Sequence, residues 1–83
     1  MDAADLELLK ASTDKYVVIH IEDGEVIVAA VHFVSDEDQD VIYDVISSNR
    51  PERYRDDTSK PAYLMPFAKI EFIEPWQQPG TPT

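Results

Sequence analysis

The chain has 83 residues, no cysteine and a formal net charge of −10, from 17 acidic and 7 basic side chains. Without cysteine it has neither a disulfide framework nor a thiolate metal site. The negative charge opposes general attraction to nucleic acid. The longest unbroken apolar run, Val26 to Val31, is far too short to span a membrane. We expect one small cytoplasmic domain over residues 1–75, with no membrane contact and a core small enough to favour a homo-oligomer.

The first expected element is a short helix over residues 3–11. Asp2 is a favourable N-cap residue, and Asp5 in the first turn complements the helix dipole. A polar segment at residues 12–14 ends the helix. The first strand is therefore expected to begin near Lys15.

The next element is a hairpin around Asp23-Gly24, which is flanked by alternating β-branched residues. This pattern predicts a two-residue turn in which both residues take positive φ. Such a turn opposes residues whose numbers sum to 47, for example Glu22 with Glu25. Both faces of the hairpin are then largely apolar. We therefore expect the second face to be covered by the helix, by barrel closure or by another subunit.

The remaining elements are shorter. An acidic turn at residues 35–39 leads into a third strand over residues 40–47. A long charged loop over residues 48–61 follows, and two short strands are expected within residues 62–74. Residues 76–83 cannot continue a strand and are expected to form a tail. Five strands in this order predict a mainly β protein with the shape of a small barrel.

This order of elements resembles the Sm-like (LSm) family over about residues 3–74. The first Sm signature is seen here as VVIHIEDGEVIVAAVHFVSDEDQDVIYDVIS. The resemblance implies an N-terminal helix and a strongly bent, five-stranded antiparallel SH3-type barrel. A glycine common in the second strand of the family is replaced by Ala29 or Ala30, which is expected to alter strand curvature.

The resemblance also implies a homo-oligomeric ring, in which the fourth strand of one subunit pairs with the fifth strand of the next. The expected interface residues are Tyr63, Leu64, Met65, Ile70, Phe72 and Ile73.

The family's nucleotide pocket is expected to be degenerate in this chain. RNA-binding members place Asp-x-(aromatic or His)-x-Asn between strands two and three, where this chain has Asp36, Asp38 and Asp40. They place a cation and a glycine between strands four and five, where this chain has Pro66 and Phe67. An aspartate cannot stack on a base, its charge repels phosphate, and the usual cation is missing.

Two functions from different classes remain open. Four of the seven cations, Arg50, Arg53, Arg55 and Lys60, lie in the long loop. They offer a route to RNA outside the usual pocket, although such a cluster commonly serves only to solvate a loop. The aromatic residues considered for base stacking are Tyr43, Tyr54 and Tyr63. The alternative is an acidic protein-interaction scaffold that avoids nucleic acid and meets a cationic protein partner.

The acidic turn also resembles the start of a calcium loop, with Asp36, Asp38 and Asp40 at alternate positions. A full EF-hand loop needs glycine at its sixth position and glutamate at its twelfth, where this chain has Val41 and Ser47. A solvated turn is therefore favoured over a metal site.

No catalytic centre can be assembled from the sequence. In the predicted register His20 and His32 fall on opposite faces and cannot share a metal. Glu22 and Glu25 would sit at a solvated hairpin end, without the burial that separates two carboxyl pKa values. We expect no enzymatic activity, no cofactor and no metal.

Overall fold

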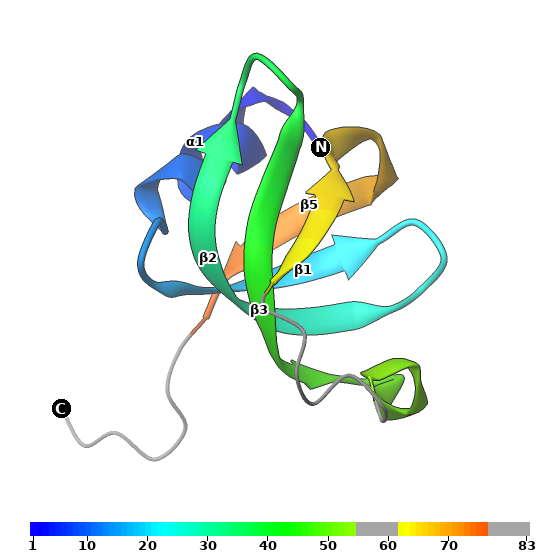
Figure 1. Cartoon of the computed structure of the whole chain (residues 1–83). Helices are drawn as coiled ribbons and strands as arrows, with labels where there is room; N and C mark the ends of the chain where they lie inside the picture. The colour runs from blue at the N-terminus through cyan, green and yellow to red at the C-terminus, as the bar shows by residue number, and fades with distance from the viewer. Residues whose placement is uncertain (55–61, 77–83) are drawn as a thin grey trace, which may run out of the picture.

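The computed structural model describes residues 1–54 and 62–76. Its elements, in chain order, are α1 (Ala3–Ala11), β1 (Tyr16–Ile21), β2 (Val26–Ser35), β3 (Asp40–Ser48), the 3₁₀-helix η1 (Pro51–Tyr54), β4 (Tyr63–Pro66), the 3₁₀-helix η2 (Phe67–Lys69) and β5 (Ile70–Pro75). The five strands form one antiparallel sheet in the order β4-β3-β2-β1-β5. Figure 1 shows how strongly this sheet bends.

The predicted mainly β fold, with a short N-terminal helix and five antiparallel strands, is confirmed. The sheet is curved but not closed, because β4 and β5 are its two edge strands. In the described part of the chain, no helix is long and apolar enough to cross a membrane.

Helix α1 covers the residues predicted for it. The Asp5 N–H donates to Asp2 Oδ1 at 2.9 Å, and the Asp2 N–H donates to Asp5 Oδ2 at 3.4 Å. This reciprocal capping box satisfies two backbone donors that a helix start leaves without partners. Leu9 is fully buried and fixes the helix against the sheet, where α1 packs on β5 and β2.

The β1–β2 hairpin is joined by three residues rather than two. The Gly24 N–H donates to Ile21 O at 2.9 Å, and the Ile21 N–H donates to Glu25 O at 2.9 Å. Gly24 has φ +94°, whereas Asp23 is not among the residues with positive φ. A turn followed by one left-handed residue is the usual three-residue hairpin loop. The prediction that both turn residues take positive φ was therefore wrong.

The longer loop shifts the pairing of the hairpin by one residue. Val17 pairs with Ala29 and Ile19 with Ile27, so opposed numbers sum to 46, and the predicted sum of 47 was wrong. A slip of one residue exchanges the two faces of a strand. The buried residues of the hairpin are consequently Val17, Ile19, Ile21, Ile27, Ala29 and Val31, together with Glu25.

Strand β2 contains two irregularities in its pairing with β3. One lies between Val28 and Ala29, and the other between Val31 and Phe33. Bulges bend a strand and increase its twist, so they supply curvature although the strand contains no glycine. The second one leaves Phe33 exposed directly after His32, which alternation already places on the outer face. The prediction that the two histidines lie on opposite faces was wrong because the one-residue shift of the β1–β2 pairing puts the even-numbered residues of both strands, His20 and His32 included, on the outer face.

The inner face of the sheet surrounds a core to which α1 and η2 each contribute one buried residue. Its members are Leu9, Val17, Ile19, Ile21, Ile27, Ala29, Val31, Val41, Tyr43, Phe67, Ile70 and Ile73. Burying a large apolar side chain of this kind stabilises the fold by roughly 1.5–3 kcal/mol. The outer face keeps five large apolar side chains exposed, namely Tyr16, Phe33, Ile46, Leu64 and Phe72.

Candidate functional site

Several of the residues singled out from the sequence gather at two ends of the curved sheet. We call one the hairpin end, formed by the β1–β2 loop and η1. We call the other the groove end, formed by the start of α1, the β2–β3 turn and η2. In Figure 1 the groove end is at the top of the view and η1 is at the bottom.

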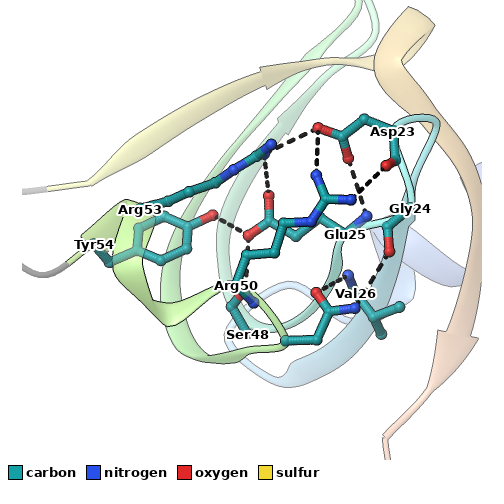
Figure 2. A network of polar contacts seen from close by, with 9 residues as sticks. Asp23, Gly24, Glu25, Val26, Ser48, Arg50, Arg53 and Tyr54 are labelled. Carbon is teal, nitrogen blue, oxygen red and sulfur yellow. Dashed lines mark hydrogen bonds and ion pairs between the residues drawn. The ribbon is translucent and has the colours of Figure 1, made fainter.

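Glu25 is the centre of the hairpin end. Its side chain is on the inner face, and the residue is only 1% exposed. The carboxylate accepts hydrogen bonds from Ser48 Oγ at 2.6 Å, Arg53 Nη1 at 2.7 Å and Tyr54 Oη at 2.7 Å (Figure 2). A buried charge is tolerated only when it is paired and hydrogen-bonded. Glu25 meets that condition and joins η1 to the hairpin.

Asp23 extends this network toward solvent. Its Oδ2 lies 3.0 Å from Arg53 Nη1 and 3.5 Å from Arg50 Nη1, and its carbonyl accepts from Arg50 Nη2 at 2.8 Å (Figure 2). The Glu25 N–H donates to Asp23 Oδ1 at 3.0 Å. This backbone hydrogen bond first, and the Arg53 guanidinium second, hold the pKa of Asp23 below its usual value. The hydrogen bond to Asp23 in turn raises the pKa of Arg53.

Asn49 fixes the same segment through the backbone. Its Oδ1 accepts from the Val26 N–H at 2.9 Å, and its Nδ2 donates to Gly24 O at 3.3 Å. The start of the predicted long loop, which contains η1, is therefore held in place by hydrogen bonds to the β1–β2 hairpin.

Arg50 and Arg53, two of the four cations predicted to contact RNA, are engaged within the molecule. Their side chains are 35% and 44% exposed, and both face acidic partners. Their charges are largely offset by Asp23 and Glu25, so a phosphate would have to compete with these carboxylates. The other two, Arg55 and Lys60, lie outside the described residues.

The three tyrosines considered for base stacking pack on one another. The Tyr43 and Tyr63 ring centroids are 5.9 Å apart, and those of Tyr54 and Tyr63 are 5.4 Å apart. Tyr43 is 3% exposed, and burial raises its pKa to about 12. Burial, followed by the hydrogen bond to Glu25, also raises the pKa of Tyr54. The buried Tyr43 ring presents no surface to a nucleotide base.

The groove end brings together three of the predicted nucleotide-pocket positions, Asp38, Pro66 and Phe67. The Phe67 N–H donates to Gln39 O at 2.8 Å, and this bond ties the β4–β5 connection to the β2–β3 turn. An open groove of about 570 Å³ lies there. It is lined by Met1, Asp2, Ala3, Leu6, Asp38, Gln39, Pro66, Phe67, Ala68 and Ile70.

The remaining two pocket positions lie beside this groove rather than in its lining. Asp36 pairs with Lys10 of α1 at 2.5 Å, and Asp40 pairs with Pro66 across the β3–β4 ladder. The sequence reasoning missed the contribution of α1 to the groove. The helix was one of three expected covers for an apolar face of the hairpin, but its sequence carries no signal for the end of the sheet on which it packs.

The predicted oligomer-interface residues divide into two groups. Leu64 and Phe72 are 58% and 36% exposed on the edge strands. Ile70 and Ile73 are buried in the core, and Tyr63 and Met65 pack partly buried against it. Leu64 and Phe72 are thus the large apolar side chains that the edge strands present to solvent.

The two histidines each lie beside one carboxylate. His32 Nε2 is 2.8 Å from Asp44 Oδ2. His20 stacks on Phe72 with ring centroids 4.0 Å apart, and its Nε2 lies 2.6 Å from Glu74 Oε1 without the alignment of a hydrogen bond. Within residues 1–54 and 62–76, no group of three or more His, Asp or Glu side chains is arranged to hold a metal ion.

Comparison of the chain with protein-family models, curated proteins and solved structures finds no match. Functional inference therefore depends on the geometry of the two ends and the two edges.

Proposed function

We propose that the protein is an Sm-like homo-oligomer, assembled as a ring, that serves as an acidic protein-interaction scaffold. The observation that carries this choice over RNA binding is the pairing of Arg50 and Arg53 with Asp23 and Glu25. These two cations are already paired, and the net charge of the whole chain is −10. Such a charge attracts cationic proteins and repels polyanions.

Within the described residues the sheet ends in two edge strands, and this arrangement supports the assembly. An unpaired edge strand offers a row of backbone donors and acceptors to another chain. Here the edges are β4 and β5, so pairing β4 of one copy with β5 of the next is a heterologous contact, which closes into a ring when the rotation permits. The same contact would bring Leu64 near Phe72 and remove both from water. This is the pairing implied by the Sm-like resemblance.

The assembly is tested by native mass spectrometry or light scattering at micromolar concentration. We expect a single closed oligomer for the wild-type chain and smaller species for Leu64→Lys, because the lysine would place a charge in the edge contact. Ile46→Lys is the matched control, since Ile46 is 50% exposed but lies on the interior strand β3. A wild-type mass equal to that of the monomer would refute the ring.

The choice between scaffold and RNA is tested with labelled U-rich and A-rich oligonucleotides at low salt, where phosphate contacts are strongest. The scaffold proposal predicts no binding. Tight binding that weakens when Arg50 and Arg53 are replaced by glutamate would overturn it in favour of RNA.

A further inference from the structure

The groove end has an apolar floor. Phe67 and Ile70 are 8% and 3% exposed, and Leu6 of α1 packs against the core beside them. At about 570 Å³ the groove is within the range of ligand-binding pockets, roughly 300–1,000 Å³. Its apolar floor would shelter an apolar side chain from water.

The charges around this floor are acidic. Asp2 and Asp38 line the groove, and the lining residues include no lysine, arginine or histidine. The one cationic group of the lining is the Met1 amino group, which donates to Ile70 O at 3.2 Å. A phosphate or carboxylate would therefore meet like charge here, whereas an ammonium or guanidinium group would meet opposite charge.

The two carboxylates differ in availability. Asp2 Oδ1 already caps α1 through the Asp5 N–H. Asp38 is exposed in the β2–β3 turn, and its backbone N–H is held by Ser35 Oγ at 3.0 Å. Within the described ranges, no cation pairs with the Asp38 carboxylate, whereas nearby Asp36 is paired with Lys10. The backbone of Asp38 is thus held in place at the edge of an apolar groove, and among the described residues its carboxylate charge has no cationic partner.

We propose that this groove binds a short basic segment of a partner protein. An apolar side chain of the segment lies on the floor of Leu6, Phe67 and Ile70, and a neighbouring lysine or arginine pairs with Asp38. The inference rests on the proposed scaffold function, which calls for a cationic partner, and it assigns the surface that such a partner uses.

The test uses the full chain and three labelled pentapeptides: Arg-Leu-Arg-Leu-Arg, Arg-Ser-Arg-Ser-Arg and Glu-Leu-Glu-Leu-Glu. Fluorescence anisotropy at low salt should show the tightest binding for the first, weaker binding for the second because it lacks apolar side chains, and none for the third. Asp38→Lys should weaken binding of the first peptide roughly tenfold, because attraction becomes repulsion. Glu52→Lys is the matched control, because Glu52 is exposed in η1 at the other end of the molecule.

A second measurement locates the peptide directly. On titration with Arg-Leu-Arg-Leu-Arg, the amide NMR signals of Asp38, Gln39, Phe67 and Ala68 should move more than those of η1. Equal weakening by Asp38→Lys and Glu52→Lys, with no localised shifts, would overturn the groove and leave the scaffold proposal standing. If neither basic peptide bound the assembled wild-type protein, both the groove and the cationic partner would be overturned.

Discussion

Replacing Glu25 should test the hairpin end most directly. Its carboxylate is buried and accepts three side-chain hydrogen bonds, from Ser48, Arg53 and Tyr54. In Glu25→Ala these donors lose their acceptor, and a cavity is left beside η1. We expect the free energy of unfolding to fall by about 3–5 kcal/mol.

This magnitude follows from how each donor is placed. A hydrogen bond to a charged group is worth roughly 1.5–3 kcal/mol. The Arg53 contribution is discounted because its side chain is 44% exposed and it keeps Asp23 as a partner. Within the described residues, the Ser48 and Tyr54 hydroxyls donate their hydrogen bonds to Glu25 alone. Glu25→Gln keeps the shape but replaces one acceptor oxygen with a donor, so it should cost about 1–3 kcal/mol.

Urea unfolding followed by far-UV circular dichroism measures these losses. Protein concentration must be held constant, because assembly makes the apparent stability depend on it. Glu22→Ala, on the exposed part of the same loop, is the control and should change stability by less than about 0.5 kcal/mol. A loss below about 1 kcal/mol for Glu25→Ala would refute the reasoning, since total stabilities of about 5–15 kcal/mol leave a 3 kcal/mol change easily visible.

Two further perturbations act at the same end of the molecule. The folded-state pKa of Tyr43 is raised from 10.0 to about 12, and that of Tyr54 is also raised, so the unfolded chain loses these protons first as pH rises. Stability should be complete below pH 10 and should fall between pH 10 and 12, as followed by urea midpoints, while absorbance at 295 nm reports phenolate formation. If both phenols ionised near pH 10 in the folded protein, their burial would be disproved. Gly24→Ala should cost about 1–2 kcal/mol, because alanine at φ +94° is strained, while its Cβ would meet only the flexible Arg50 Nη2 at 3.4 Å. Gly24→Asn should cost less in the same urea assay, and equal stability of Gly24→Ala and wild type would contradict the strain argument.

Local chemistry in the sequence was sufficient to predict the helix and the strands. Asp2 and Asp5 specify the start of α1 because capping depends on residues only three positions apart. The β-branched runs specify the strands for the same reason, since alternation and turn residues are local properties. These elements in order were enough to predict the mainly β fold.

The burial of Glu25 could not be predicted, because it depends on whether the hairpin loop has two residues or three. A two-residue turn would have placed Glu25 opposite Glu22 at a solvated end. The observed three-residue loop pairs it with Ile21 and turns its side chain inward, where Ser48 and η1 supply donors. Asp23-Gly24 is compatible with either loop, so the sequence pattern leaves the register open.

The candidate groove was predictable only in part, because its walls come from segments far apart in the chain. The Sm-like resemblance singled out Asp38, Pro66 and Phe67, which do meet there. Leu6 lies within the helix expected over residues 3–11, and nothing in its neighbourhood in the sequence indicates that it lines a groove beside η2. Only the packing of α1 on β5 reveals this wall.

The strand order also has a consequence for how the chain folds. Three of the four ladders join consecutive strands, whereas β5 must return to β1 across the intervening strands, β2 to β4. Closing a loop of about fifty residues lowers the chain entropy before the β1–β5 contacts can form and offset that loss. We therefore expect the β1–β4 meander to form first and β5 to dock last. Until β5 docks, the edge of β1 has no partner strand. The β5 strand of a second copy can pair with it as well as the β5 strand of the same chain. Refolding at high protein concentration should therefore favour strand exchange between copies.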